Sequence, residues 1–254
     1  MISLAGKVAL ITGGSRGIGA ATVELLAQAG AAVAFGYHRN AAAARGLERR
    51  LQQRGHEALA VRADLRRVTD GRRLVGRTVK RFGRLDILVA NAGIWNARDI
   101  PIEKLSERQW DEMMETNLKS VYSVIRFAVP IMKRQRSGRI IAISSTAGQR
   151  GEAFHDHYAA SKGAIISLVK GLSTELARSN ILVNCVAPGW VDTEMSRPAL
   201  ARAAQRRQVE AQIPLGRVAA AEEIAGPILF LASGLATFLT GEIVNVNGGA
   251  VLIG

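Results

Sequence analysis

The chain has 254 residues, of which 48% are hydrophobic, and 34 basic against 21 acidic side chains give it a net charge of +13. The apolar fraction and the six prolines exclude a disordered or collagen-like chain, and the length suits one large domain. The single cysteine, Cys185, excludes an intramolecular disulfide framework and a cysteine-based zinc site. It favours a reducing compartment, and we expect a cytoplasmic protein.

Two segments bear on targeting. The N-terminal residues lack the basic region and the long apolar stretch of a signal peptide. Residues 224–241 carry no charge, and a run of 18 residues is at the lower limit for a membrane span. The run contains three glycines and a proline, however, which favour a buried helix followed by a loop. We therefore expect no membrane span.

Short apolar runs alternate with longer helical patterns along the whole chain. Strands are expected at 7–12, 31–35, 58–62, 85–90, 138–144, 181–186 and 242–246, and helices at 17–30, 41–55, 70–82, 106–136 with a break in its first half, 159–179 and 221–232. This alternation predicts an α/β fold with a doubly wound parallel sheet covered by helices on both faces. Since no linker or composition break divides the chain, residues 1–254 are expected to form one domain.

A glycine-rich loop directly follows the first expected strand and opens the first expected helix. Its glycines, Gly13, Gly17 and Gly19, are spaced G-x-x-x-G-x-G. Glycine permits a tight turn and lets main-chain N–H groups approach a diphosphate at a helix N-terminus. The placement of the loop in the first strand–helix unit makes a dinucleotide site the favoured interpretation over a plain glycine-rich turn.

The end of the second expected strand indicates which nucleotide binds. Enzymes that prefer NAD usually have a carboxylate there, which accepts from the ribose 2′-hydroxyl. Residues 35–40 contain no carboxylate, whereas His38 and Arg39, together with Arg16, can bind a 2′-phosphate. The sequence therefore favours NADPH over NADH, although Arg39 can also be read as an ordinary surface arginine.

Tyr158 and Lys162 are four residues apart at the start of an expected helix and so share one face. A nearby ammonium favours the phenolate form of a tyrosine, whose pKa is otherwise about 10. Ser145, at the end of the fifth expected strand, can hold a substrate carbonyl. A Tyr-x-x-x-Lys pair by itself is common and usually structural.

Taken together, these motifs resemble the short-chain dehydrogenase/reductase family over essentially the whole chain. The resemblance rests on the 12–19 loop, Asp64-Leu65, Asn91-Ala92-Gly93, Asn117, Ser145, Tyr158 with Lys162, Asn184, Pro188-Gly189, Thr193 and residues 213–217. It implies a single-domain Rossmann fold with a seven-stranded parallel sheet.

The resemblance also implies roles for individual residues. Asn117, Ser145, Tyr158 and Lys162 would be catalytic: Tyr158 as proton donor in reduction, Lys162 lowering its pKa and binding the nicotinamide ribose, Ser145 positioning the carbonyl, and Asn117 holding a water. Cofactor contacts would come from Gly13, Ser15, Arg16, Gly17, Ile18, Gly19, His38, Arg39, Asp64, Leu65, Asn91, Ala92, Gly93, Tyr158, Lys162, Pro188, Gly189, Val191 and Thr193. Ser144 adjoins Ser145, but the thirteen-residue spacing to Tyr158 favours Ser145.

Substrate specificity is expected to come from residues 147–157 and from a lid over residues 190–217. The candidate substrate residues are Ser145, Gln149, Phe154, Tyr158, Trp190 and Met195, and Trp95 is expected near the edge of the cleft. His155 and His157 can either touch substrate or belong to a polar loop at a subunit contact. We expect no metal.

Within the family, the chain most resembles the 3-oxoacyl-acyl-carrier-protein reductases. The basis is the 15–19 loop, the second strand without a carboxylate and the 245–249 ending. Arg136 matches a family position used for contact with the acidic carrier protein, but Ser179 stands where another basic residue is usual. The alternative enzyme is a reductase of a free ketone, a sugar or another small alcohol.

The basic excess is concentrated between Arg39 and Arg84, a segment that contains thirteen Arg and one Lys but only four carboxylates. A non-catalytic NADP-binding or nucleic-acid-binding module is therefore the alternative from another class. No nucleic-acid motif is present, so no specific nucleic-acid partner is expected, and a solvated helical surface is favoured. The resemblance implies a homotetramer, or a homodimer, paired through residues 106–136 and 159–179.

Overall fold

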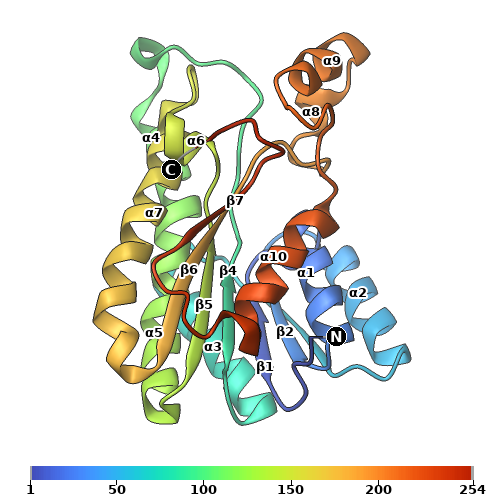
Figure 1. The fold of residues 1–254 in the computed structure, drawn as a ribbon, viewed down its shortest axis with the longest axis vertical. Coiled ribbons are helices and arrows are strands. Elements are labelled where there is room, and N and C mark those ends of the chain that lie inside the picture. The colour runs from blue at the N-terminus through green and yellow to red at the C-terminus, as the bar shows by residue number, and fades with distance from the viewer. Residues whose placement is uncertain (1, 253–254) are drawn as a thin grey trace.

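Seven parallel strands form one sheet in the computed structural model, which describes residues 2–252 (Figure 1). The strand order is β3-β2-β1-β4-β5-β6-β7, so the doubly wound parallel sheet predicted from the alternating pattern is confirmed. The strands are β1 (Val8–Ile11), β2 (Ala32–Tyr37), β3 (Ala58–Arg62), β4 (Ile87–Ala90), β5 (Gly138–Ile143), β6 (Ile181–Pro188) and β7 (Ile243–Val246).

Helices cover both faces of the sheet and create two separate apolar cores. Because successive strand residues point to opposite faces, Ala9 and Ile11 pack with α1, α2 and α10, whereas Leu10 packs with α3, α5 and α7. The longer helices are α1 (Gly17–Gln28), α2 (Ala41–Gln53), α3 (Val68–Phe82), α4 (Glu107–Met114), α5 (Ser120–Gln135), α7 (Asp156–Leu176), α9 (Ala203–Ala211) and α10 (Ala221–Ala232). The short ones are η1 (Ile102–Lys104), η2 (Glu115–Lys119), α6 (Ala147–Arg150), η3 (Ala177–Ser179), α8 (Arg197–Leu200) and η4 (Gly234–Ala236).

Local signals set several helix ends. The Asn40 side chain accepts from the main-chain N–H of Ala43 and so begins α2, and Ser106 with Gln109 forms a capping box at the start of α4. The helix predicted to begin at residue 159 begins at Asp156 instead, which places Tyr158 in its first turn. The two short helices of the 190–217 segment, α8 and α9, have weak periodicity and were not predicted.

The order of the strands positions the functional region. The sheet is built outward in opposite directions from the neighbouring strands β1 and β4, and ligands bind outside the carboxyl ends of such strands. Figure 1 shows α8 and α9 standing beyond that end of the sheet, where the 190–217 lid was predicted.

The uncharged run at 224–241 contains most of α10 and the turn η4, as predicted, and Ile224, Ile228 and Leu231 of this helix are buried in the core. None of the helices within residues 2–252 is both long enough and apolar enough to cross a membrane.

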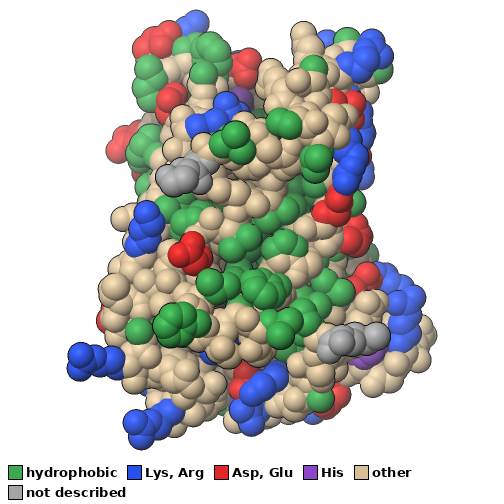
Figure 2. All heavy atoms as spheres, in the orientation of Figure 1, with side chains coloured by type: hydrophobic (Ala, Val, Ile, Leu, Met, Phe, Trp, Pro, Cys, Tyr) green, Lys and Arg blue, Asp and Glu red, His purple; other side chains and the backbone are tan. Residues whose placement is uncertain are grey.

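The basic segment lies mainly on the outer surfaces of α2 and α3. Five of its arginines pair with carboxylates: Arg50 with Glu24, Arg66 with Asp64, Arg73 with Asp70, Arg81 with Glu57 and Arg84 with Asp86. Figure 2 shows basic side chains spread along the edge of the molecule formed by α2. This arrangement suits a solvated surface.

Asp86 connects the beginnings of the two central strands. Its carboxylate accepts from the main-chain N–H of Val8 at 2.9 Å and from Arg84 Nε at 2.8 Å, and the residue is only 4% exposed. Replacing Asp86 by Ala would leave the Val8 donor and the guanidinium without their shared acceptor. We expect Asp86→Ala to lower the free energy of unfolding by about 2–3 kcal/mol, measured by urea denaturation.

The matched control is Glu57→Ala, because the ion pair of Glu57 with Arg81 is long, at 3.5 Å, and exposed on both sides. This variant should stay within about 0.5 kcal/mol of the wild-type stability. Equal losses in the two variants would contradict the role given to Asp86.

Candidate active site

The glycine-rich loop is locked to the end of β4 by Thr12. The Thr12 hydroxyl oxygen accepts from the main-chain N–H groups of Asn91 and Ala92, each at 2.9 Å. In return, the Asn91 side chain donates to the Thr12 carbonyl oxygen at 2.9 Å. The loop and the Asn91-Ala92-Gly93 motif, which are far apart in the sequence, therefore form one unit.

Two positions in this unit admit glycine alone. Gly13 has φ +64°, in the left-handed region, and a Cβ on Gly19 would lie 2.2 Å from the Gly13 carbonyl oxygen. The loop thus packs main chain against main chain at the N-terminus of α1, where N–H groups are free to meet a phosphate. These residues fit the diphosphate of a dinucleotide.

A groove runs from this loop across the ends of β2 and β3. Fourteen of the predicted cofactor residues line it: Gly13, Ser15, Arg16, Gly17, Ile18, Gly19, His38, Arg39, Asp64, Leu65, Asn91, Ala92, Gly93 and Thr193. The others, Pro188, Gly189, Val191, Tyr158 and Lys162, line an adjoining cleft that shares Ile18, Asn91, Gly93, Ile94, Thr193 and Met195 with the groove. The structure therefore brings all the predicted cofactor residues to one continuous depression.

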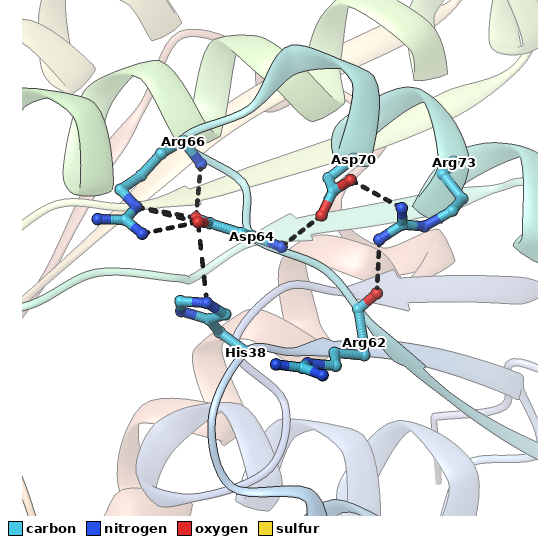
Figure 3. A network of polar contacts seen from close by, with 6 residues as sticks. All are labelled: His38, Arg62, Asp64, Arg66, Asp70 and Arg73. Atoms are coloured by element: carbon cyan, nitrogen blue, oxygen red, sulfur yellow. Dashed lines mark hydrogen bonds and ion pairs between the residues drawn. The ribbon is translucent and has the colours of Figure 1, made fainter.

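Figure 3 shows the polar network at the end of β3. Asp64 pairs with Arg66, with Oδ2 2.7 Å from Nη2, and its Oδ2 lies 3.8 Å from His38 Nε2. The Arg66 side chain is the main cause that holds the pKa of Asp64 down at about 2. The main-chain N–H of Asp64 donates to the Asp70 carboxylate. Arg66 therefore favours the ionised form of Asp64, and Asp70 holds the main chain of Asp64 in place.

The end of β2 presents Tyr37, His38 and Arg39 to the groove, with no carboxylate among them. Arg16 of the glycine-rich loop also lines the groove and pairs with Glu194 of the lid segment at 2.8 Å, and both side chains are about half exposed. Basic side chains from two separate segments of the chain thus line the groove expected to hold the adenosine end of a nucleotide.

Asn117 lies in η2, a π-helical turn between α4 and α5, which is the break expected within residues 106–136. Its Oδ1 accepts from the main-chain N–H of Ile94 at 2.7 Å, and its Nδ2 donates to the Ile94 carbonyl oxygen at 3.0 Å and to Ser161 Oγ at 3.1 Å. A π turn inside a longer helix is frequent at functional sites. Here the π turn places the buried Asn117 amide against the segment that follows β4.

Lys162 and Tyr158 lie side by side in the first turns of α7, and both are at least nine-tenths buried. The Lys162 ammonium donates to the Ile143 carbonyl oxygen at 2.9 Å and lies 5.8 Å from the centre of the Tyr158 ring. Burial lowers the pKa of Lys162 to about 8.

Burial also raises the pKa of Tyr158 to about 12, although hydrogen bonding to Ser145 acts in the opposite direction. The lowering of the Tyr158 pKa by Lys162, which the resemblance implies, stays a prediction. The phenol is protonated at neutral pH, which is the form that can give up a proton.

The structure separates the roles of the two adjacent serines. The Ser144 hydroxyl is buried and donates to the Lys162 carbonyl oxygen at 2.7 Å, so it holds α7 to the end of β5. Ser145 is partly exposed in the cleft, and its oxygen accepts from the main-chain N–H of Ala147 at 3.1 Å. Ser145, but not Ser144, is among the groups that act on the pKa of Tyr158.

The predicted substrate residues divide into two groups. Ser145, Tyr158, Trp190 and Met195 line the cleft. Phe154 and Gln149 do not: Phe154 is 49% exposed at the surface, and Gln149 donates to Asn245 Oδ1 at 2.6 Å. Phe154 also has φ +65°, so the loop turns there, a conformation that residue identity does not reveal.

Sequence reasoning did not single out Arg150 and Glu152, which line the cleft near Tyr158. The available signal was their place in the segment between Ser145 and Tyr158, which contributes one wall of the cleft. The two histidines of that segment are buried, and the ring nitrogens of His155 lie 2.7 Å from the Asn96 and 3.2 Å from the Ala153 carbonyl oxygens. No group of three or more His, Cys, Asp or Glu that could hold a metal occurs within residues 2–252.

Known proteins match this chain along almost its full length. Residues 13–251 match the family described as Enoyl-(Acyl carrier protein) reductase. The 3-oxoacyl-[acyl-carrier-protein] reductase FabG of Staphylococcus aureus is 39% identical over 243 residues, which are 96% of this chain and 97% of that protein. FabG of Thermotoga maritima is also 39% identical, over 98% of this chain and 99% of its own.

Solved structures agree with these sequence matches. The crystal structure of gox2181 has a TM-score of 0.94 at 32% identity and covers 98% of this chain and 96% of its own. A dehydrogenase/reductase from Sinorhizobium meliloti has a TM-score of 0.88 at 39% identity, covering 98% and 97%. The chain therefore belongs to the short-chain dehydrogenase/reductase family and is an oxidoreductase that interconverts a carbonyl and an alcohol with a nicotinamide cofactor.

Proposed function

We propose that the protein is an NADPH-dependent reductase of 3-oxoacyl thioesters, acting on the ketone next to the thioester group. The observation that carries the proposal is the meeting of Ser145, Tyr158 and Lys162 where the nucleotide groove joins the cleft. The names of the FabG relatives supply the substrate class. The family description names an enoyl group instead, so the test must compare the two.

The bound nicotinamide cofactor supplies hydride to the carbonyl carbon. The glycine-rich loop would hold its diphosphate, and Asp64 and Leu65 would lie against its adenine. His38 and Arg39 would bind the 2′-phosphate, which a carboxylate at their place would repel.

Proton transfer belongs to the residues of the chain. In this proposal the Ser145 hydroxyl donates a hydrogen bond to the substrate carbonyl oxygen and orients it toward Tyr158. The Tyr158 phenol gives its proton to that oxygen as negative charge develops there. The Lys162 ammonium, one helical turn away, then stabilises the phenolate that remains. Asn117 holds the Ile94 main chain beside them and would keep a water in place for the return of the proton.

An acyl carrier protein is the proposed donor of the thioester. Arg136, the residue assigned to carrier contact, follows the C-terminal end of α5 and precedes β5, at the end of the sheet opposite Tyr158 (Figure 1). A carrier bound there would have to deliver its acyl group to the cleft of another subunit.

A homotetramer is the proposed assembly, and the proposed compartment is the cytoplasm. The exposed Trp110 and Tyr122 on α4 and α5 support pairing through the predicted helices. Figure 2 shows a second gathering of hydrophobic side chains on the face of α10 and β7, where Phe230, Leu235 and Phe238 are exposed. The chain's one cysteine, Cys185, is buried and free, in keeping with a reducing compartment.

The proposed reaction is tested by NADPH oxidation with a 3-oxoacyl thioester, beside the matching enoyl thioester and a panel of free ketones and sugars. We expect turnover of the 3-oxoacyl thioester and a fall in kcat of about 10²–10⁴ in Tyr158→Phe, because the proton donor is lost. Glu57→Ala, which alters an exposed carboxylate outside the groove and the cleft, is the control and should keep wild-type rates. Full activity in Tyr158→Phe would overturn the mechanism, and reduction of the enoyl thioester alone would overturn the substrate class.

The two serines should separate rate from stability. We expect Ser145→Ala to lower kcat/KM about 100-fold and to lower the stability less than Ser144→Ala does, because Ser145 is partly exposed in the cleft. Ser144→Ala should instead lower the free energy of unfolding by about 1–2 kcal/mol, because the Lys162 carbonyl loses a buried partner. Steady-state kinetics and thermal melts of both variants measure this, and the reverse pattern would move the catalytic role to Ser144.

Nucleotide preference should depend on Arg39. We expect Arg39→Ala to raise the Kd of NADPH about tenfold and to leave the Kd of NADH within about twofold, since only NADPH has the 2′-phosphate. Nicotinamide fluorescence titrations measure both values. Arg49→Ala, on the exposed side of α2 and outside the groove, is the control. Equal weakening of the two nucleotides would refute the assignment.

A further inference from the structure

One corner of the substrate cleft is polar and aromatic. It consists of Trp95, Arg150, Glu152 and Trp190, which we call the Glu152 corner, and all four line the same cleft as Tyr158. The Trp95 and Trp190 rings meet edge to face, with centroids 5.6 Å apart and planes at 86°. On its other side Trp95 stacks on the buried His155, with centroids 5.1 Å apart. The two indoles are therefore fixed by packing.

Glu152 is held in this corner by the same groups. Its Oε1 lies 3.7 Å from His155 Nδ1. Burial raises the pKa of Glu152, while His155, Trp95 and the Arg150 charge act in the opposite direction. Its side chain is 22% exposed and lines the cleft. The groove and the cleft together thus place a carboxylate near the carbonyl site.

The chemistry of this corner sets what a substrate can put there. An aliphatic chain would displace the remaining water from Glu152 and from Arg150 and offer no hydrogen bond in exchange, which is unfavourable for a charged group. A hydroxyl or amide N–H replaces that water with a donor for the carboxylate, while the carbon skeleton packs against the indole rings. A second carboxylate would meet Arg150 but would be repelled by Glu152.

We propose that Glu152 is a specificity-determining residue that selects substrates whose chain, beside the reduced carbonyl, is short or carries a hydroxyl or amide donor, over substrates with a long aliphatic chain. This selection rests on the proposed reduction at Tyr158 and narrows its substrate class. It acts through a direct hydrogen bond from the substrate to the Glu152 carboxylate.

The test uses three 3-oxoacyl thioesters of equal length that end in a methyl, a hydroxymethyl and a carboxylate group. In the wild type we expect kcat/KM for the hydroxymethyl substrate to exceed that for the methyl substrate about tenfold, and the carboxylate substrate to be no better than the methyl one. In Glu152→Leu the methyl substrate should become the better one. Glu152→Gln keeps an acceptor oxygen and should keep part of the hydroxymethyl preference.

Controls separate selection from folding. Glu103→Leu removes an exposed carboxylate of η1 outside the cleft and should keep the wild-type ratios. Should Glu152→Leu melt well below the wild type, Trp95→Phe serves instead: it keeps an aromatic ring without the indole N–H and should reduce the hydroxymethyl preference.

Three results would overturn the proposal: equal use of the methyl and hydroxymethyl substrates by the wild type, unchanged ratios in Glu152→Leu, or preference for the carboxylate substrate. Failure of the proposed function looks different, because no thioester would then be reduced. In that case the same comparison is made with a matched ketone and hydroxyketone, and loss of the hydroxyl preference in Glu152→Leu would still be required.

Discussion

The hydrogen bonds of Thr12 join the carboxyl ends of the two central strands, and the geometry of the site depends on this joint. Its hydroxyl accepts two main-chain N–H groups after β4, while Asn91 returns a hydrogen bond to the main chain after β1. The sheet grows outward in both directions from these strands, so the chain must diverge there and leave a depression. The glycine-rich loop lies on one side of the joint and the cleft with Tyr158 on the other.

Burial governs the chemistry of the cleft. The phenol and the ammonium lie close together in a place where water is scarce, so each is pushed toward its neutral form: the pKa of Tyr158 rises to about 12 and that of Lys162 falls to about 8. A protonated phenol suits a proton donor in reduction. The opposite demand, a stabilised phenolate, arises only once the proton has left, and the nearby Lys162 can then meet it. Burial thus sets the protonation preferences of both groups, and the proposed reduction uses them.

The basic side chains of the chain do not all serve the same purpose. On α2 and α3 several arginines are matched by local carboxylates, so a surface that is strongly basic in sequence is partly neutralised in space. Arg66 forms an ion pair with Asp64 and so holds this carboxylate in the nucleotide groove. Arg16 and Arg39 face the groove itself. The location of a charge relative to the groove, rather than the total charge, decides its function.

The sequence by itself determined the fold, because continuous apolar strands alternating with amphipathic helices leave a doubly wound sheet as the way to bury both faces of every strand. It also placed the glycine-rich loop, Tyr158 and Lys162, since these depend on spacings within one strand–helix unit. Only the tertiary structure put Phe154 outside the cleft and brought Glu152 into one cleft with Trp95 and Trp190. Those outcomes depend on loop conformation and on contacts between distant segments, which local patterns do not encode.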